Sequence, residues 1–400
     1  MTTFPNPFKP GAGHQPPYLA GREEETHEFE ELLAQEVVLH NLILSGLRGI
    51  GKTVLLESFK PLAQQKGWLW AGTDCSEAYS NDENTMVIRL LTDIALVTSS
   101  IKVGSRPSVG FQPPNITRDT YLNFDFLINY YTSVPGLPAD KLKALLSFVW
   151  ACLQPAGVKG VVFAYDEAQT LSDHAKDKQY PLSLLLDVFQ FLQKNNIPYM
   201  LVLTGLPTLL VKLVETRTYS ERLFRVRILD RLTDKESRDA ILIPIKKSHH
   251  PLGFSDVGVN LIVDQSGGYP YFIQFICREA YDILEQQLTR GEIPSLPMDA
   301  ILQKLDNDFF AGRWAQATDR ERDLLSVMAA LGTSEFSVSQ IVEQAKKQPG
   351  LKPFSSSQVS QMLNRLIEIS LIYKNRRGSY SFAVPLLDRY ITRNNEAKPL

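Results

Sequence analysis

Residues 41–56 read NLILSGLRGIGKTVLL, and this stretch decides the fold. A short apolar run, Leu42 to Leu44, enters a glycine-rich loop that ends in Lys52 and Thr53, and an apolar segment suited to a helix follows at once. The loop fits the pattern G-x-x-x-x-G-K-[ST] between a strand and a helix. Glycines let the backbone curl so that amide N–H groups point at phosphate oxygens. A glycine-rich surface turn is the alternative, but both flanking elements favour a phosphate loop.

This loop predicts a nucleotide site. Lys52 would reach the β and γ phosphates, and the Thr53 hydroxyl would hold Mg²⁺. The expected cofactors are therefore ATP and Mg²⁺. The loop residues expected to contact the nucleotide are Gly46, Arg48, Gly49, Ile50, Gly51, Lys52, Thr53 and Val54.

A second apolar run, residues 161–165, ends in the acid pair Asp166 and Glu167. Buried parallel strands are apolar on both faces in this way. In phosphate-loop ATPases the first acid holds Mg²⁺ through its water shell, and the second polarises the attacking water. An acid pair alone is usually a solvated turn. Together with the upstream loop, it predicts Asp166 as a metal ligand and Glu167 as a catalytic residue.

Two further residues are candidates because of their places beside later strands. Thr204 follows the buried run 199–203 and could sense the third phosphate, or it could merely end a strand. Arg222 precedes the last strand, residues 225–229, and could reach the γ phosphate of a neighbouring subunit's nucleotide, with Arg217 as second choice. The alternative for Arg222 is a surface arginine or an internal ion pair.

Composition limits the class of protein. A chain of 400 residues has room for two or three domains, and no apolar run approaches the length of a membrane span. The first 17 residues lack the apolar segment of a signal peptide, and three distant cysteines argue against a disulfide framework or a CxxC metal site. We therefore expect a cytoplasmic protein without a membrane partner. The net charge of −2 gives no general attraction to nucleic acid.

The order of elements predicts four parts. Residues 1–17 form a flexible arm, and residues 18–232 form an α/β domain with five strands that alternate with helices, hence a doubly wound parallel sheet. Within it, residues 102–115 are an irregular insertion or a surface hairpin, and a helical pair spans 118–132 and 139–153. Residues 233–316 form a helical lid, in which Thr233 and Glu236 make a capping box.

Residues 317–400 predict a winged helix-turn-helix, with three helices and a two-stranded wing. On the third helix an apolar stripe leaves Ser357, Gln361, Asn364 and Arg365 facing outward, where they could contact base edges. The wing charges that could contact phosphates of duplex DNA are Lys374, Arg376 and Arg377. Because Glu368 shares the helix and winged helices often bind proteins, a protein partner is the alternative.

Six stretches carry a family likeness over almost the whole of residues 18–393. They are LAGRE at 19–23, the loop, FAYDEAQ at 163–169, LTGLP at 203–207, YSERLF at 219–224 and GGYPYFIQF at 267–275. Together they resemble AAA+ ATPases of the origin-recognition and STAND-related type. The C-terminal run, with FFAGRW at 309–314, looks like a bacterial group described only as ATP-binding proteins. The resemblance implies sheet order 5-1-4-3-2, ATP held between sheet and lid with Arg22 in contact, and an assembly through Arg222.

One departure from the family pattern concerns the lid. Replication initiators resemble this chain, but their lid helix carries a sensor arginine in a G-[DN]-x-R pattern, whereas Gly268, Tyr269, Pro270 and Tyr271 stand here. The Gly-x-Pro looks instead like the STAND ATPases, in which the proline lies against the nucleotide and the lid acts as a switch. Pro270 is therefore expected at the nucleotide.

Three hypotheses for function follow. The first is a Mg-ATP-binding and hydrolysing AAA+ switch that controls assembly and positions the winged helix on DNA or a partner. The second is a nucleotide-locked scaffold in signalling or defence, which oligomerises on a trigger without binding DNA. The third, a DNA-binding regulator with a degenerate ATP fold, fits poorly because no core residue is missing.

Overall fold

The computed structural model describes residues 5–11, 13–75, 82–107, 117–216, 220–248, 252–375 and 378–396. The chain divides into two compact units. The sheet unit comprises Glu23–Ser45 and Leu55–Ile228, and the lid unit comprises Met1–Arg22, Gly46–Val54 and Leu229–Leu400. Each unit has its own hydrophobic core, and the phosphate loop belongs to the unit of the C-terminal helices.

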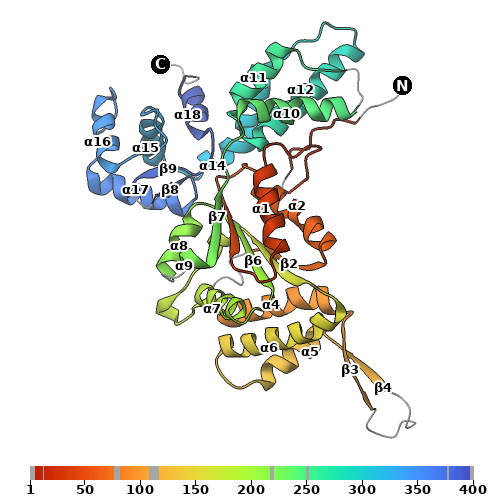
Figure 1. Cartoon of the computed structure of the whole chain (residues 1–400). Helices are drawn as coiled ribbons and strands as arrows, with labels where there is room; N and C mark the ends of the chain where they lie inside the picture. Colours follow the sequence, from red (N-terminus) through yellow and green to blue (C-terminus); the bar gives the residue numbers. More distant parts are fainter. Residues whose placement is uncertain are drawn as a thin grey trace. The chain divides into compact units, whose positions relative to one another are not determined.

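The sheet unit is built on five parallel strands (Figure 1). Their order across the sheet is β2 (Trp68–Asp74), β5 (Gly160–Asp166), β6 (Tyr199–Gly205), β1 (Asn41–Ser45) and β7 (Phe224–Ile228). Numbered along the chain and read from β7, this is 5-1-4-3-2, so the expected order is confirmed. Strands β1, β5 and β6 are buried over their whole length, as their apolar runs predict.

Alternate residues of the strands pack into layers on opposite faces of the sheet. Phe163 and Leu201 join the core formed with helices α4 (Glu83–Thr98), α5 (Phe124–Ser133), α6 (Pro138–Leu153) and α7 (Pro181–Lys194). On the other face, Phe29 of α1 (Glu23–Ala34) stacks on Phe59 of α2 (Lys52–Gln65) with ring centroids 4.2 Å apart, and Trp70 lies edge-on at 6.3 Å. The period of two in a strand produces this three-layer arrangement.

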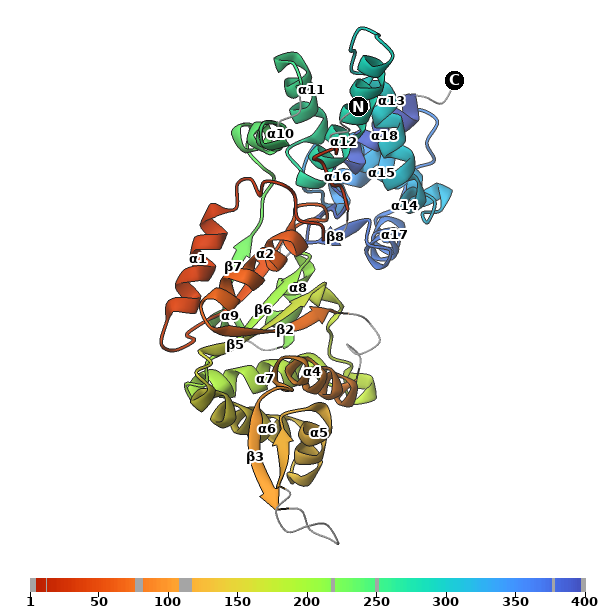
Figure 2. The same cartoon turned by 90° about the vertical axis from the view of Figure 1, so that its right-hand side faces the viewer.

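An antiparallel hairpin follows α4 and extends beyond helices α5 and α6 of the same unit (Figure 2). Strands β3 (Lys102–Pro107) and β4 (Thr117–Tyr121) form it, and Lys102 and Asp119 make an ion pair at 2.7 Å. The expectation of a surface hairpin is confirmed for the described part of 102–115. The helix expected from 118 is wrong in its first turn, because these residues pair with β3 and the helix begins only after Asn123 caps it.

The shorter elements of the sheet unit connect these parts. They are η1 (Gln154–Ala156), η2 (Ala168–Thr170), η3 (Ala175–Asp177), α8 (Thr208–Thr216) and α9 (Ser220–Leu223). Of these, η2 and α8 follow β5 and β6 and therefore lie near the carboxyl edge of the sheet. Nowhere in the described ranges is a helix both long and apolar enough to cross a membrane.

The middle of the lid unit is helical, and its described residues from 233 to 314 contain no strand, as expected. The helices are α10 (Asp234–Ser248), α11 (Asp256–Ser266), α12 (Pro270–Thr289), α13 (Met298–Leu305) and α14 (Gly312–Trp314), with a π-helical turn, η4 (Asp306–Ala311), between the last two. The capping box that opens α10 is confirmed, because Glu236 accepts the Thr233 amide at 2.7 Å and Thr233 accepts the Glu236 amide at 3.3 Å.

The C-terminal elements follow the order expected for a winged helix-turn-helix. They are α15 (Asp319–Ala329), α16 (Val338–Lys347), α17 (Ser356–Glu368), β8 (Ile372–Lys374), β9 (Tyr380–Phe382) and α18 (Leu387–Glu396). The backbone of Phe336 exchanges two hydrogen bonds with Tyr380, which adds a short third segment to the wing. The last helix, α18, was not expected from the sequence.

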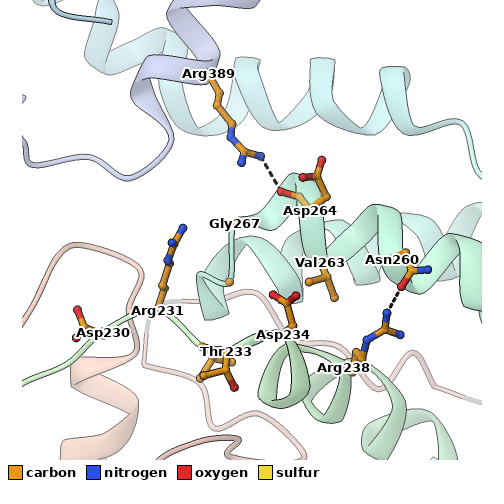
Figure 3. Close-up of a pocket in the computed structure, with 12 residues that line it drawn as sticks. Asp230, Arg231, Thr233, Asp234, Arg238, Asn260, Val263, Asp264, Gly267 and Arg389 are labelled. Atoms are coloured by element: carbon orange, nitrogen blue, oxygen red, sulfur yellow. Dashed lines mark hydrogen bonds between the residues drawn. The ribbon is translucent and has the colours of Figure 1, made fainter. Parts of the chain in front are cut away.

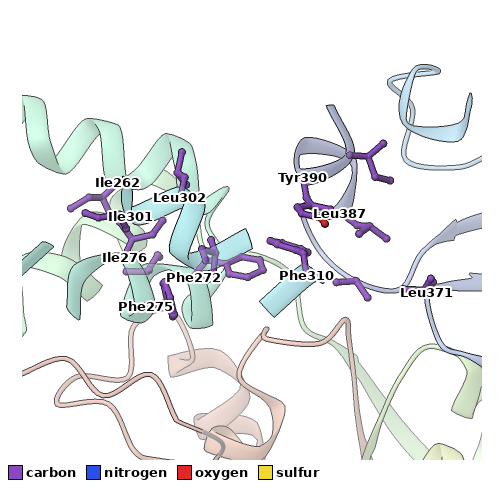
Figure 4. Packing of buried hydrophobic residues seen from close by; sticks show 14 of the residues in the cluster. Ile262, Phe272, Phe275, Ile276, Ile301, Leu302, Phe310, Leu371, Leu387 and Tyr390 are labelled. Atoms are coloured by element: carbon purple, nitrogen blue, oxygen red, sulfur yellow. The ribbon is translucent and has the colours of Figure 1, made fainter. Parts of the chain in front are cut away.

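One continuous core runs through the lid helices and the C-terminal helices (Figure 4). Phe310 of η4 lies at its centre, with its ring 5.8 Å from that of Phe272 in α12 and 5.1 Å from that of Tyr390 in α18. The contact of Phe310 with Tyr390 crosses residue 316, where the boundary between lid and winged helix is expected. The two parts therefore share buried surface, which couples their positions.

Residues 5–11 correct the expectation of a flexible arm. The Phe8 side chain is fully buried, and its ring lies 6.2 Å from Phe254 and 6.3 Å from Tyr281. Arg278 donates to the Phe8 carbonyl oxygen at 3.2 Å, and Gln274 accepts the Lys9 amide at 3.1 Å. A single aromatic anchor among prolines therefore fixes this segment along α12.

Candidate nucleotide-binding site

The phosphate loop (residues 46–53) adopts a curled conformation that requires glycine. Gly49 has φ of +75° and Gly51 has φ of +93°, which side chains rarely tolerate. Across the described residues, the amide N–H groups of Arg48, Gly49, Ile50 and Gly51 have no hydrogen-bond acceptor. Four adjacent donors without an acceptor form a cradle that fits the oxygens of a phosphate.

Lys52 opens helix α2 and bends back over the loop. Its ammonium donates to the carbonyl oxygens of Gly46 and Leu47, each at 3.0 Å, and the residue is only 7% exposed. Gly46 is also constrained, because a Cβ there would lie 2.9 Å from the Leu229 carbonyl oxygen. The loop therefore holds a buried positive charge beside its free amides.

Arg22, expected at the nucleotide, lies beside the loop and is buried. Its guanidinium donates to three carbonyl oxygens, those of Gly21 and Ile50 at 3.1 Å and that of Asp230 at 2.9 Å. These bonds tie the segment before α1 to the loop and to the start of the lid. A second tie comes from Gln15, whose amide donates to the Val54 carbonyl oxygen at 2.7 Å.

The first turn of the lid helix α12 is bonded to the loop. The Tyr271 amide donates to the Gly49 carbonyl oxygen at 3.1 Å, and Pro270 is the first residue of the helix. Gly268 allows this approach, since it has φ of +77° and a Cβ there would lie 2.4 Å from the Leu232 carbonyl oxygen. The structure thus places Pro270 next to a residue that touches the loop.

In the sheet unit, Asp166 and Thr204 meet at the carboxyl ends of neighbouring strands. The Thr204 hydroxyl donates to Asp166 Oδ1, and the Glu167 amide donates to the same oxygen at 2.7 Å. Both side chains are buried, Asp166 at 3% exposure and Thr204 at 0%. Thr204 therefore ends a strand and also orients the first acid.

Glu167 stands directly after β5 in an uncommon left-handed conformation, with φ of +51°. The Glu167 carboxylate accepts a hydrogen bond from the side-chain nitrogen of Gln169. The side-chain oxygen of Gln169 in turn accepts a hydrogen bond from the backbone amide of Leu206 at 3.0 Å. Lys212, whose pKa is lowered by burial, donates to the Gln169 carbonyl oxygen. Gln169 belongs to the quoted FAYDEAQ run, but its role depends on a fold that sequence spacing does not reveal.

Asp74 is a third carboxylate at this edge that sequence reasoning missed. It ends β2 opposite Asp166, and the Cys75 amide donates to the Asp166 carbonyl oxygen at 2.7 Å. Although Asp74 is exposed, partial desolvation raises the pKa of its carboxyl, and the charges of Asp166 and Glu167 raise it further. Three negative groups therefore gather where parallel strands end.

The acids Asp74, Asp166 and Glu167 could attract a cation, but they do not form a complete set of metal ligands. Among the described residues, no group of three His, Cys, Asp or Glu side chains could by itself hold a metal ion. Magnesium commonly keeps water and phosphate oxygens as ligands and takes only one or two from protein. Asp166 and the Thr53 hydroxyl are of the right chemical type to supply those protein ligands.

Arg222 lies at the end of α9 and is exposed. No described carboxylate pairs with it, so the structure gives no internal ion pair to this arginine. Arg225 and Arg227 of β7, by contrast, both pair with Glu28 of α1. Arg217 lies outside the described residues.

The outward face of α17 is as expected. Ser357, Gln361, Asn364 and Arg365 are exposed, and Val359, Leu363 and Leu366 are buried. Arg365 also makes an ion pair with Glu368 at 3.4 Å. Lys374 is exposed at the end of β8, whereas Arg376 and Arg377 lie outside the described residues.

A separate cavity of about 740 Å³ lies within the lid unit and contains no residue of the phosphate loop (Figure 3). Its walls come from the segment that enters α10, from α11 and from α18. Figure 3 shows Arg389 reaching from α18 to the Asp264 carbonyl oxygen, at 2.6 Å, and Arg238 bonded to Asn260. The Arg389 bond joins the C-terminal helix to the lid, and the Arg238 bond joins α10 to α11.

The parallel sheet of order 5-1-4-3-2, the phosphate loop after β1 and the helical lid define the class: the chain has the fold of a phosphate-loop ATPase. Two solved proteins share this fold over nearly the whole chain. The Walker-type ATPase PABY2304 of Pyrococcus abyssi is 16% identical, with 94% of this chain and 96% of that chain covered and a TM-score of 0.57.

The ORC2 protein of Aeropyrum pernix is also similar. Its ADP form is 16% identical with 98% of both chains covered and a TM-score of 0.52, and its ADPNP–ADP complexes are 14% identical with 97% and 98% covered and a TM-score of 0.50. The chain therefore shares its fold with the Pyrococcus abyssi ATPase and with the Aeropyrum pernix ORC2 protein. Residues 307–391 match a family described as a domain of unknown function, DUF8462. No curated protein matches the sequence.

The carboxylate cluster generates a prediction about pH. Because the folded-state pKa of Asp74 is raised, its protonated form favours folding, and that stability is lost as the pH rises through the raised value. Asp74→Asn should therefore melt at a higher temperature than the parent at pH 7 without Mg²⁺. The difference should shrink as the pH falls toward 3.8, the ordinary value for this carboxyl. Thermal unfolding at both pH values checks this.

The matched control is Asp177→Asn, since Asp177 is an exposed carboxylate of the same unit, outside the cluster. This variant should melt like the parent at both pH values. If Asp74→Asn is less stable than the parent at pH 7, the carboxylates do not repel one another as described.

Proposed function

We propose that this chain is a Mg-ATP-binding and hydrolysing AAA+ switch. The observation that carries the proposal is the curled loop, with four amides that lack an acceptor in the described chain, bonded through Gly49 to the lid helix. The loop begins directly after Ser45, which lies opposite Gly205 in the sheet. Ser45 itself lies in the sheet unit, at the carboxyl edge at which Asp166 and Thr204 also lie.

The loop residues bind the phosphates in this proposal. The amides of Arg48, Gly49, Ile50 and Gly51 donate to phosphate oxygens, and Lys52 exchanges its two carbonyl acceptors for the β and γ phosphates. Thr53 and Asp166 hold Mg²⁺, which when bound neutralises charge on the phosphate oxygens. Arg22 keeps the loop in shape through its bond to the Ile50 carbonyl oxygen.

Glu167 is the general base of the proposed reaction. Its carboxylate takes a proton from the attacking water, and Gln169 holds that carboxylate through a bridge to the Leu206 amide. Thr204 orients Asp166 and reports on the third phosphate. Arg222 is exposed and has no described carboxylate partner. In an assembly, Arg222 of one subunit would contact the γ phosphate of the nucleotide bound to the neighbouring subunit.

The lid provides the switch. Helix α12 carries Tyr271 where a sensor arginine stands in replication initiators, so the proposed lid responds to nucleotide through its bond to Gly49 and through Pro270. A ligand shifts an equilibrium only by binding one arrangement more tightly than the other. The shared core around Phe310 then passes a lid movement to the C-terminal helices.

Two substitutions separate binding from hydrolysis. Lys52→Ala should lose ATP affinity by about tenfold or more, because a charge-assisted contact to two phosphates disappears. Glu167→Gln should bind ATP normally but turn it over about a hundredfold more slowly, as expected when a general base is removed. Equilibrium binding and phosphate release measure the two effects.

Exposed residues of α2 supply matched controls, Lys60→Ala for the lysine and Glu57→Gln for the acid. Both should behave like the parent protein. Unchanged binding in Lys52→Ala together with unchanged turnover in Glu167→Gln would rule out the ATPase assignment.

The C-terminal elements are proposed to bind duplex DNA. The exposed face of α17, with Gln361, Asn364 and Arg365, would contact base edges, and the wing charges would contact phosphates. The alternative is a nucleotide-locked scaffold that oligomerises on a trigger without DNA. The Gly-x-Pro of the lid and the ion pair of Arg365 with Glu368, which reduces the charge of α17, favour that alternative.

Removing the wing charges discriminates between these two functions. If the wing binds DNA, the triple variant Lys374→Ala, Arg376→Ala, Arg377→Ala should lower affinity for duplex DNA and flatten its dependence on salt, by about one unit of slope per lost phosphate contact. DNA retardation at several salt concentrations measures both. Nucleotide retained through purification, with no retardation even at low salt, would instead identify the scaffold.

A further inference from the structure

Arg313 is an arginine of α14 that no sequence pattern assigns to a site. Its guanidinium stacks over the Phe309 ring at 4.2 Å and donates to the Phe309 carbonyl oxygen. The Phe309 ring lies 5.1 Å from that of Tyr271, whose amide binds the Gly49 carbonyl oxygen at 3.1 Å. A short series of contacts within the lid unit therefore joins Arg313 to the phosphate loop.

The largest effect of a neighbouring charge on Arg313 comes from another cation, Arg48. Burial lowers the pKa of Arg313, and the positive charge of Arg48 in the loop lowers it further. In the described chain, Arg313 makes no ion pair and Arg48 neither makes an ion pair nor donates a hydrogen bond. Arg48 lies in the row of free amides, so an anion bound there would be attracted by the charge of Arg48 and also by that of Arg313.

We propose that Arg313 binds a phosphate oxygen of the nucleotide held by the loop, and so serves as the sensing arginine that α12 lacks at Tyr271. This inference rests on the proposed function and adds a residue from outside the lid helices to that site. A phosphate beside Arg48 would offset the repulsion between the two cations. Arg presents several N–H groups in a plane, which suits phosphate better than a single ammonium does.

The position of Arg313 gives the contact a consequence for the C-terminal helices. It follows the π-helical turn η4, a kind of irregularity that is frequent at functional sites. The next residue, Trp314, accepts a hydrogen bond from Arg322 of α15 at 3.2 Å, and its ring lies 5.9 Å from that of Tyr390 in α18. A nucleotide that binds Arg313 could therefore change the contacts of Trp314 with α15 and α18.

The test compares nucleotide affinity in Arg313→Met and Arg313→Lys. Methionine keeps the packing on Phe309 without the charge, and lysine keeps the charge without the planar group. Equilibrium titrations use the intact chain with ADP and with a non-hydrolysable ATP analogue. We expect Arg313→Met to lose about tenfold or more for at least one of the two nucleotides, and Arg313→Lys to lose less.

The matched control is Arg320→Met. Arg320 stacks over Phe354 at 3.7 Å in the same unit, so the variant removes the same charge and a similar ring contact away from the loop. It should bind both nucleotides like the parent. The melting temperature gives a second readout. Without nucleotide, Arg313→Met should melt at the temperature of the parent, because the substitution relieves the repulsion from Arg48. The increase in melting temperature on adding ADP should be smaller than in the parent.

Equal affinity of Arg313→Met and the parent for both nucleotides would overturn this inference and leave the proposed ATPase intact. An equal loss in Arg320→Met would also overturn it, since the effect would then be one of general charge. A parent protein that binds neither nucleotide would refute the proposed function together with the inference.

Discussion

The hydrogen bond from the Tyr271 amide to the Gly49 carbonyl oxygen is the contact on which the arrangement of the lid unit depends. It uses an amide of the first turn of α12 that no carbonyl inside the helix can accept. It also requires glycine at 49, because φ is positive there and a Cβ would lie 3.2 Å from the Cβ of Tyr271. The loop that would bind phosphate thus also positions the helix that would respond to it.

The helix that this bond positions, α12, also contributes to the hydrophobic core that the lid shares with the C-terminal helices. Helix α12 presents Phe272 to Phe310, and Phe310 in turn stacks against Tyr390. Burying such rings favours a few well-packed arrangements over continuous adjustment. A change at the first turn of α12 therefore affects the packing of α18, some 120 residues later in the chain.

Local patterns were enough to predict the sheet, the loop and the acid pair. Strands β1, β5 and β6 are apolar on both faces, and the G-x-x-x-x-G-K-[ST] pattern needs only its two flanking elements to be recognised. The capping box at Thr233 was predictable for the same reason, because its bonds join residues three apart. The strand order itself came from the family resemblance, since parallel strands leave no local record of their neighbours.

The rest depends on contacts between distant residues. Phe8 is one aromatic residue among prolines, and only the surfaces of Phe254 and Tyr281 make it a core residue. Partial desolvation raises the pKa of Asp74, and the pairing of β2 with β5 adds the charge of Asp166, which is distant in the sequence. Residues 118–121 become a strand because β3 is available to pair with them. The Gln169 bridge and the effect of the Arg48 charge on Arg313 likewise result from folding and cannot be predicted from sequence spacing.

We propose that a nucleotide bound at the loop alters the lid and the segment before α15. Hydrogen exchange of the intact chain, with and without Mg-ATP, tests it most directly, because it reports the amides themselves. With Mg-ATP we expect slower exchange in three separate peptides: the loop at 46–53, the first turn of α12 at 269–273, and residues 309–314. Protection of the loop alone, with the other two peptides unchanged, would contradict it.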